Sequence, residues 1–180
     1  VIDKDGNIVD SNKPTPDVPD NTQTTKTKYT ISGMAWIDEN LNGQRDESES
    51  AKSGIEVLLY NISAKKFITD EKGNVVVKTT GEDGKYTFTN IYSGQYYVIF
   101  KYDTENYGIT EYQASNVSTS QNNDAIEKLA RIFDETRTIG ITNTISLNSN
   151  RSDIDIGLVE NKNFDLKIEQ FIEKITVTNK

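Results

Sequence analysis

The sequence predicts an all-β protein in which antiparallel strands form a β-sandwich. At least five short strand-like segments between residues 29 and 159 recur at a spacing of about 8–12 residues, which is typical of sandwiches. Turns rich in Gly, Asn and Asp separate these segments. Hydrophobic residues make up 34% of the chain and charged residues 27%, a balance that suits a strand-rich protein with a polar surface.

The domain is expected to begin after a proline-containing linker. Residues 1–28 open with a turn sequence, DKDGN, between two apolar dipeptides, which is typical of the last hairpin of a preceding module. All three prolines of the chain follow among Thr, Asp and Asn residues: Pro14, Pro16 and Pro19. We expect an extended, semi-stiff linker here, although a tail with no spacing role has a similar composition.

The first strands follow in order. Residues 29–37 alternate between two faces, and residues 55–60 again resemble a strand. Residues 64–80 predict a hairpin, and residues 85–90 alternate. The most apolar strand is predicted at residues 96–102, where four large side chains share the core-facing side: Tyr96, Val98, Phe100 and Tyr102.

The next part of the chain predicts a loop and one helix. Residues 103–123 are polar and rich in Asn and Ser, so we expect a loop. In residues 124–136, Asp124 is placed to cap a helix. The apolar residues recur at helical spacing: Ile126, Leu129, Ala130, Ile132 and Phe133. We expect a short amphipathic helix that packs on the sandwich, with partner binding as the less common alternative.

The domain is expected to end with strands at residues 139–147 and 154–159. Residues 161–180 then restart an alternating apolar pattern. We interpret them as a linker and the first strand of a following module, with a final strand of the same domain as the alternative. The sandwich therefore spans residues 29–160 in this interpretation.

The loop at residues 38–49 matches a calcium-binding sequence. The pattern D-x-[DN]-x-[DN]-G-x5-E is filled at every required position, with Gly43 where the chain must turn sharply. Calcium takes six to eight hard oxygen ligands. This spacing supplies them, directly or through water, from Asp38, Asn40, Asn42, Gln44, Asp46 and Glu49.

The charge of the loop supports calcium binding. Residues 38–49 hold five acidic residues and one basic residue, Arg45, and so carry half of the chain's net charge of −8. These carboxylates repel one another unless a cation lies among them. The alternative is an acidic turn without a metal, since Asn, Asp and Gly favour turns anyway. Because strands flank the loop, it does not belong to a helix–loop–helix EF-hand.

The composition excludes several classes of function. The chain has no cysteine and no histidine, which rules out disulfides, thiol nucleophiles, the usual zinc sites and histidine acid–base catalysis. A pI near 4.7 argues against binding to nucleic acid, and no apolar run approaches membrane-spanning length. No nucleophile elbow, phosphate loop or zinc motif occurs, so we do not expect an enzyme.

Taken together, the motifs resemble a known family. Residues 33–60 are similar to the B-type repeat of serine–aspartate-repeat surface proteins of Gram-positive bacteria, the SdrD B-like domain, which is related to Cna B-type domains. A second family run, T-x-x-D-G-x-Y-x-F-x-x-[LI]-x-x-G-x-Y-x-V-x-F, is matched at residues 80–100. Residues 153–158 resemble the family's last strand, so the resemblance covers about residues 29–160.

The resemblance implies a seven-stranded, prealbumin-like Greek-key sandwich that binds calcium and acts as a rigid spacer at the bacterial cell wall or cell surface. The calcium ligands carry over to the six residues named above, and Asp83 and Asp155 are weaker candidates for a further ion. The expected partners are neighbouring modules of the same chain and a host or cell-surface ligand bound through another domain.

Two departures from the family pattern matter. The segment at residues 103–146 is longer than in a minimal B repeat. Related Cna B-type domains often join a first-strand lysine to a last-strand asparagine by an isopeptide bond, but this chain has Trp36 where that lysine would stand. We therefore expect no such cross-link in this module, whereas Lys167 or Lys174 could serve one in a following module.

Two functions remain as hypotheses. The first is a non-catalytic spacer or stalk module stabilised by calcium, with Asn40 and Asn42 in place of aspartates tuning the site toward extracellular calcium. The second is a module that binds protein or glycan through exposed tyrosines. Tyr97 points away from the core-facing side of its strand and is the best single candidate.

Overall fold

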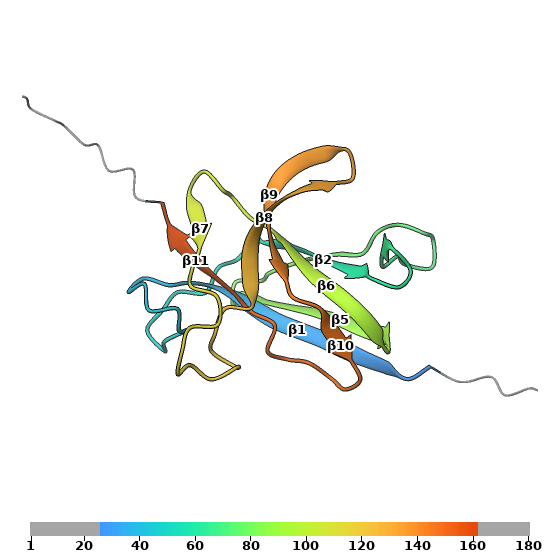
Figure 1. Ribbon diagram of the computed structural model, residues 1–180, viewed down its shortest axis with the longest axis horizontal. Coiled ribbons are helices and arrows are strands. Elements are labelled where there is room, and N and C mark those ends of the chain that lie inside the picture. The colour runs from blue at the N-terminus through green and yellow to red at the C-terminus, as the bar shows by residue number, and fades with distance from the viewer. Residues whose placement is uncertain (1–25, 162–180) are drawn as a thin grey trace, which may run out of the picture.

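The computed structural model describes residues 26–161 and shows two β-sheets packed face to face (Figure 1). The linker predicted before Tyr29 and the strand predicted after Asn161 lie largely outside the described residues. In chain order the strands are β1 (Lys28–Ile37), β2 (Glu56–Asn61), β3 (Lys66–Phe67), β4 (Val77–Thr79), β5 (Lys85–Tyr92), β6 (Gly94–Lys101), β7 (Tyr107–Ile109), β8 (Ala125–Ile132), β9 (Glu135–Thr142), β10 (Ile145–Leu147) and β11 (Ile156–Glu160).

The first sheet has the order β5-β1-β11-β7. Strand β1 pairs antiparallel with β5 and parallel with β11. The sequence predicted antiparallel strands, so this parallel pair is a difference. The two strands can run in the same direction because the connection between them is long and contains the whole second sheet.

The second sheet has the order β3-β2-β6-β9-β8, with β4 pairing to β2 and β10 to β6. The predicted apolar strand is β6, which pairs with β2 over six residue pairs. The described residues contain eleven strands rather than the seven implied by the resemblance, because the sheet edges are built from short segments. The all-β sandwich itself is confirmed.

The main core lies between the two sheets. Alternation along β1 and β6 buries one face of each strand, and Tyr96 and Tyr102 are buried as predicted. The Tyr86 ring stands edge-on to Phe88 and Phe100, with centroids 6.0 and 5.8 Å away, an arrangement that aromatic pairs favour. The largest fully buried side chains of this core are Phe88, Phe100, Ile31, Leu59, Leu147, Ile156 and Leu158. Leu58 and Ile139 belong to a second, smaller cluster with Ile99 and Ile132.

The helix predicted at residues 124–136 is wrong. This segment forms β8 and the turn into β9, and the two strands pair over eight residue pairs. Three of the apolar residues that suggested a helix also fit a strand, because Ile126, Ala130 and Ile132 share one face of β8. Leu129 lies on the other face and is exposed. Asp124 does not cap a helix but accepts a hydrogen bond from the Asp155 N–H (3.1 Å). A helix this short is only marginally stable alone, whereas the hairpin gains pairing with β6.

Candidate metal centre

The loop at residues 38–49 leaves the end of β1 and returns to an isolated bridge between Trp36 and Ala51. Two residues in it have left-handed backbone conformations, Leu41 (φ 62°) and Gly43 (φ 71°). A Cβ on Gly43 would also lie 2.7 Å from the Ala114 Cβ. Glycine is therefore required at this position both by the turn and by the close neighbour.

Asp38 organises the turn that follows it. Its carboxylate accepts hydrogen bonds from the N–H groups of Asn42 (3.2 Å) and Gly43 (2.8 Å). The Thr110 hydroxyl donates a third hydrogen bond to the same carboxylate. Because Asp38 is only 1% exposed, these donors satisfy a carboxylate that burial would otherwise destabilise.

Three of the predicted ligands converge on a fourth, Asp46. The side-chain amides of Asn40 (2.8 Å), Asn42 (3.0 Å) and Gln44 (2.8 Å) all donate hydrogen bonds to its carboxylate. The hydrogen bonds from Asn40 and Asn42 are the main reason that the pKa of Asp46 is lowered. The loop thus closes around the Asp46 carboxylate through amide donors.

Glu49 folds back over the same loop. Its carboxylate accepts hydrogen bonds from the N–H groups of Glu39 (3.1 Å) and Asp46 (3.0 Å). Burial raises the pKa of Glu49, and the negative charges of Asp38 and Asp46 raise it further. The three carboxylates among the predicted ligands therefore lie close enough to repel one another.

These residues fit calcium in their chemistry. Every side chain of the set offers a hard oxygen, and the glycine turn is the one that a calcium loop needs. The orientations of these side chains are set by hydrogen bonds within the loop. No three carboxylates in residues 26–161 converge as metal ligands. Asn40, Asn42 and Gln44 present nitrogen rather than oxygen to Asp46. Calcium binding therefore requires the amides of Asn40 and Asn42 to rotate, whereas Gln44 would offer its backbone carbonyl.

The two weaker candidates lie in different environments. Asp83 is exposed in a turn and accepts a hydrogen bond from the Lys85 N–H (3.0 Å). Asp155 is 2% exposed and accepts one from the Met34 N–H (2.9 Å). Only Asp155 is linked to the loop, through Arg45, whose Nε lies 3.9 Å from its Oδ2.

The segment that contacts the loop at residues 38–49 was not identified from the sequence. Residues 110–123 were predicted only as a polar loop, yet Gln44 forms a bridge with Asn122. The Arg45 N–H donates to the Gln121 carbonyl (2.8 Å) and its guanidinium to the Ser120 carbonyl (2.7 Å). No local pattern signals contacts between residues some 75 positions apart, so sequence reasoning had no means to find them.

The buried side chain of Asn123 ties this segment to the sheet. It donates to the carbonyls of Thr110 (3.0 Å) and Ala125 (2.9 Å), and it accepts from the N–H groups of Ala125 (3.1 Å) and Gly157 (3.3 Å). A fully buried amide that makes four hydrogen bonds to the backbone of three residues fixes the backbone around it. Asn123 thereby positions Thr110, which donates to Asp38.

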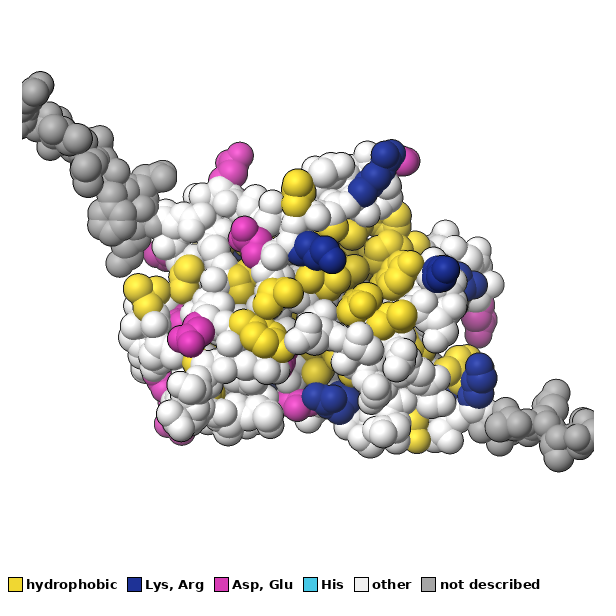
Figure 2. Space-filling view, viewed as in Figure 1, with side chains coloured by type: hydrophobic (Ala, Val, Ile, Leu, Met, Phe, Trp, Pro, Cys, Tyr) yellow, Lys and Arg dark blue, Asp and Glu magenta, His cyan; other side chains and the backbone are white. Residues whose placement is uncertain are grey.

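Tyr97, the predicted binding residue, lies on the outer face of the second sheet. It stacks on Tyr60 (6.5 Å between centroids), which stands edge-on to Phe67 (5.4 Å). Phe133, half-exposed at the tip of the β8–β9 hairpin, lies 5.2 Å from Phe67. Figure 2 shows hydrophobic side chains gathered over this side of the molecule. These four residues form an aromatic row on a partly open surface.

The family described as the SdrD B-like domain matches residues 29–158. Serine-aspartate repeat-containing protein C of Staphylococcus aureus, strain MRSA252, is 40% identical over 75 residues, which is 41% of this chain and 7% of that protein. The same protein from strain Newman matches equally.

Solved structures with similar folds include two pilins. The minor pilin GBS52 of Streptococcus agalactiae is 9% identical, with a TM-score of 0.44, over 86% of this chain and 49% of that one. The major pilin subunit BcpA of Bacillus cereus is 14% identical, with a TM-score of 0.37, over 76% and 30% of the two chains. In residues 26–161, no helix is long and apolar enough to cross a membrane.

Proposed function

This chain belongs to the SdrD B-like domain family, and on that premise we propose that it is a non-catalytic spacer module stabilised by calcium. Its place is extracellular, at the bacterial cell surface. Its partners in this proposal are calcium and the neighbouring modules of a longer surface protein.

The direction of the chain supports a spacer. Strands β1 and β11 are parallel neighbours, so the polypeptide enters the module at the start of β1 and leaves it at the end of β11. Figure 1 shows these two ends on opposite sides of the molecule along its long axis. Modules joined in this way extend a chain rather than fold it back, which is the observation that carries the spacer proposal.

The loop at residues 38–49 supports the calcium part of the proposal. Asp38, Asp46 and Glu49 would supply carboxylate oxygens, and Asn40, Asn42 and Gln44 would supply carbonyl oxygens. Bound calcium would neutralise the crowded carboxylates. A ligand that binds only the folded state stabilises it by about 2.7 kcal/mol at a hundredfold excess over its dissociation constant.

Thermal unfolding in excess calcium and in chelator tests this metal dependence. We expect calcium to raise the melting temperature by about 10 °C. The double variant Asp46→Ala/Glu49→Gln should lose the increase, while Asp38 is kept because it holds the turn. An equal melting temperature of the wild-type protein in calcium and in chelator would overturn the calcium proposal.

Small-angle X-ray scattering of two copies joined in tandem tests the spacer role. The maximum dimension should exceed that of one copy by at least one module length. A compact, side-by-side pair would contradict the proposal, whatever the calcium result.

A second function is favoured by the aromatic row of Tyr60, Phe67, Tyr97 and Phe133. Partly exposed aromatic side chains are common at binding surfaces, so we propose protein or glycan binding there as the alternative. Replacing Tyr97 and Phe133 by alanine should abolish binding to a glycan array or a panel of surface proteins, if this face binds them. Unchanged binding would leave the row as a structural feature.

A further inference from the structure

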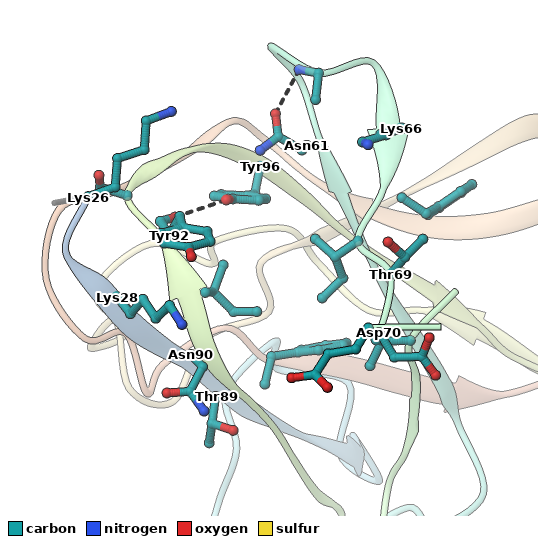
Figure 3. Close-up of a pocket in the computed structure, with 18 of the residues that line it drawn as sticks. Lys26, Lys28, Asn61, Lys66, Thr69, Asp70, Thr89, Asn90, Tyr92 and Tyr96 are labelled. Carbon is teal, nitrogen blue, oxygen red and sulfur yellow. Dashed lines mark hydrogen bonds between the residues drawn. The ribbon is translucent and has the colours of Figure 1, made fainter. Parts of the chain in front are cut away.

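A groove opens on the side of the sandwich where the edges of the two sheets part (Figure 3). Its volume is about 730 Å³. One wall is a run of five consecutive residues at the end of β5, residues 88–92, and the other is a run of six, residues 66–71. Figure 3 shows Lys28, Asn90 and Tyr92 on one side and Lys66, Thr69 and Asp70 on the other. The groove thus lies between a strand on one side and, on the other, a segment that begins in β3 and ends in a turn.

Strand β5 presents a free edge to this groove. Within residues 26–161 it is the terminal strand of the first sheet, and its one pairing partner there is β1. The register of its pairing with β1 shifts between Tyr29 and Ile31, which indicates a β-bulge. At this bulge, Asn90 of β5 takes a left-handed conformation (φ 60°). Such bulges are frequent at sheet edges beside binding sites, because they redirect a side chain. An unpaired strand edge offers a row of backbone donors and acceptors to another extended chain.

Apolar side chains line the inside of the groove. Phe88, Ile91 and Tyr96 belong to the buried core, and Ile68 and Val76 pack against that core while staying partly exposed. Tyr92 at the rim is half-exposed. A bound strand could therefore bury its alternate side chains against these residues.

The rim carries positive charge in a protein whose net charge is −8. Four lysines line the groove, Lys26, Lys28, Lys66 and Lys78, against two acidic residues. None of the four forms an ion pair with a carboxylate in the described part of the chain, and the Lys28 ammonium lies over the Tyr92 ring at 4.9 Å. Within residues 26–161, the four ammonium groups therefore have no direct carboxylate contact, which an anionic partner would supply.

The acidic residue Asp70 is already engaged by its own turn. Its carboxylate accepts hydrogen bonds from the N–H groups of Lys72 (2.9 Å) and Asn74 (2.9 Å) and from the Asn74 side-chain amide (3.2 Å). These hydrogen bonds lower the pKa of Asp70 and keep it charged, so the positive charge of the rim comes from four lysines outnumbering Asp70 and Glu71.

We propose that this groove binds an extended acidic peptide, which adds as a strand to the free edge of β5. Backbone hydrogen bonds to β5 would supply affinity, apolar side chains of the peptide would face the core, and its carboxylates would meet the lysines. Strand addition accounts for the free edge, the apolar lining and the basic rim together, whereas a small anion would use only the rim.

Fluorescence polarisation with the full chain and labelled, capped peptides of about ten residues tests the proposal. The main probe alternates valine and glutamate, a second alternates valine and lysine, and a third is polyglutamate. We expect the valine–glutamate peptide to bind at least tenfold more tightly than either of the others. Hydrogen exchange of residues 85–92 should slow when that peptide binds.

Charge-reversal variants locate the site. Lys66→Glu/Lys78→Glu should weaken binding of the valine–glutamate peptide at least tenfold. The control Lys128→Glu/Arg131→Glu makes the same change in net charge at exposed positions outside the groove and should stay within twofold of the wild-type protein.

The proposal would be overturned by no binding of the valine–glutamate peptide, by equal weakening in both double variants, or by binding without slower exchange in residues 85–92. Polyglutamate binding as tightly as the valine–glutamate peptide would instead show a general polyanion surface and would also overturn strand addition.

Discussion

The guanidinium of Arg45 extends from the loop at residues 38–49 and ends 3.9 Å from the carboxylate of Asp155. Asp155 lies just before β11, so this contact links the candidate calcium loop to the strand by which the chain leaves the module. Burial raises the pKa of Asp155 to about 7, although Arg45 and a hydrogen bond from the Met34 N–H act in the opposite direction. The negative charges of Asp124 and Asp153 add to the increase.

The raised pKa of Asp155 predicts a dependence of stability on pH. The unfolded chain releases this proton near the ordinary value of 3.8, and the folded protein releases it near 7. Between these values the folded protein holds the extra proton, so the free energy of unfolding should fall as pH rises from about 4 to 7, by at most about 4 kcal/mol from this group. Asp155→Asn should remove that part of the slope while keeping an acceptor for Met34.

Urea denaturation at several pH values in chelator measures this effect, with the exposed Asp83→Asn as the control. The wild-type protein and Asp155→Asn should differ more in stability at pH 7.5 than at pH 4, with the variant relatively more stable at the higher pH. Parallel pH profiles would show that Asp155 does not titrate in this range.

Glu49→Gln should have opposite effects with and without calcium. With calcium, loss of a carboxylate ligand should weaken binding at least tenfold, as measured by isothermal titration calorimetry. In chelator the variant should be no less stable than the wild-type protein, because burial and the nearby carboxylates already disfavour the charge on Glu49. Asp134→Asn, at an exposed position outside the candidate ligand set, should change neither value, and calcium binding unaffected by Glu49→Gln would contradict the ligand assignment.

Gly43→Ala should destabilise the folded protein by about 2–4 kcal/mol. The left-handed conformation costs an alanine about 1–2 kcal/mol, and its Cβ would meet Ala114 at 2.7 Å. Gly73→Ala is the matched control, since Gly73 is also left-handed (φ 85°) but has no neighbour within 4 Å of an added Cβ. Chemical denaturation of both variants separates the backbone cost from the steric cost, and equal losses would show that the loop moves away from Ala114 freely.

Asn123→Ala should cost about 2–4 kcal/mol of unfolding free energy, because it leaves several buried backbone groups without partners. Asn143→Ala, which removes only an exposed hydrogen bond to the Tyr112 hydroxyl, should stay within about 0.5 kcal/mol. Urea denaturation checks both. A small loss in Asn123→Ala would mean that water replaces the amide.

Local patterns predicted most of the strands and the loop residues. Alternation in β1 and β5 and the apolar run of β6 are properties of the segments themselves, and the calcium pattern lies within twelve residues. The Asp70–Asn74 turn of the predicted hairpin is also present, with its N–H to carbonyl bond at 2.9 Å.

Features that depend on distant contacts were not predictable. The segment at residues 125–132 has apolar residues that fit both periods, and pairing of β9 with β6 favours the strand. The support of Asp38 by Thr110, and the parallel pairing of β1 with β11, join residues more than 70 positions apart. The groove beside β5 depends on which strand occupies the sheet edge, which no single segment specifies.

The parallel pairing of β1 and β11 determines how the module responds to mechanical tension. Backbone hydrogen bonds join β1 to the segment at residues 151–158, which leads into β11. At one end the Arg151 N–H donates to the Thr30 carbonyl (2.9 Å), and at the other the Asp38 N–H donates to the Leu158 carbonyl (2.7 Å). Pulling the two chain ends apart slides one segment along the other, so these bonds are loaded together in shear rather than opened one by one. Resistance to such a force depends on the rate of unfolding rather than on equilibrium stability, and the fold places this clamp directly between the points where force enters and leaves.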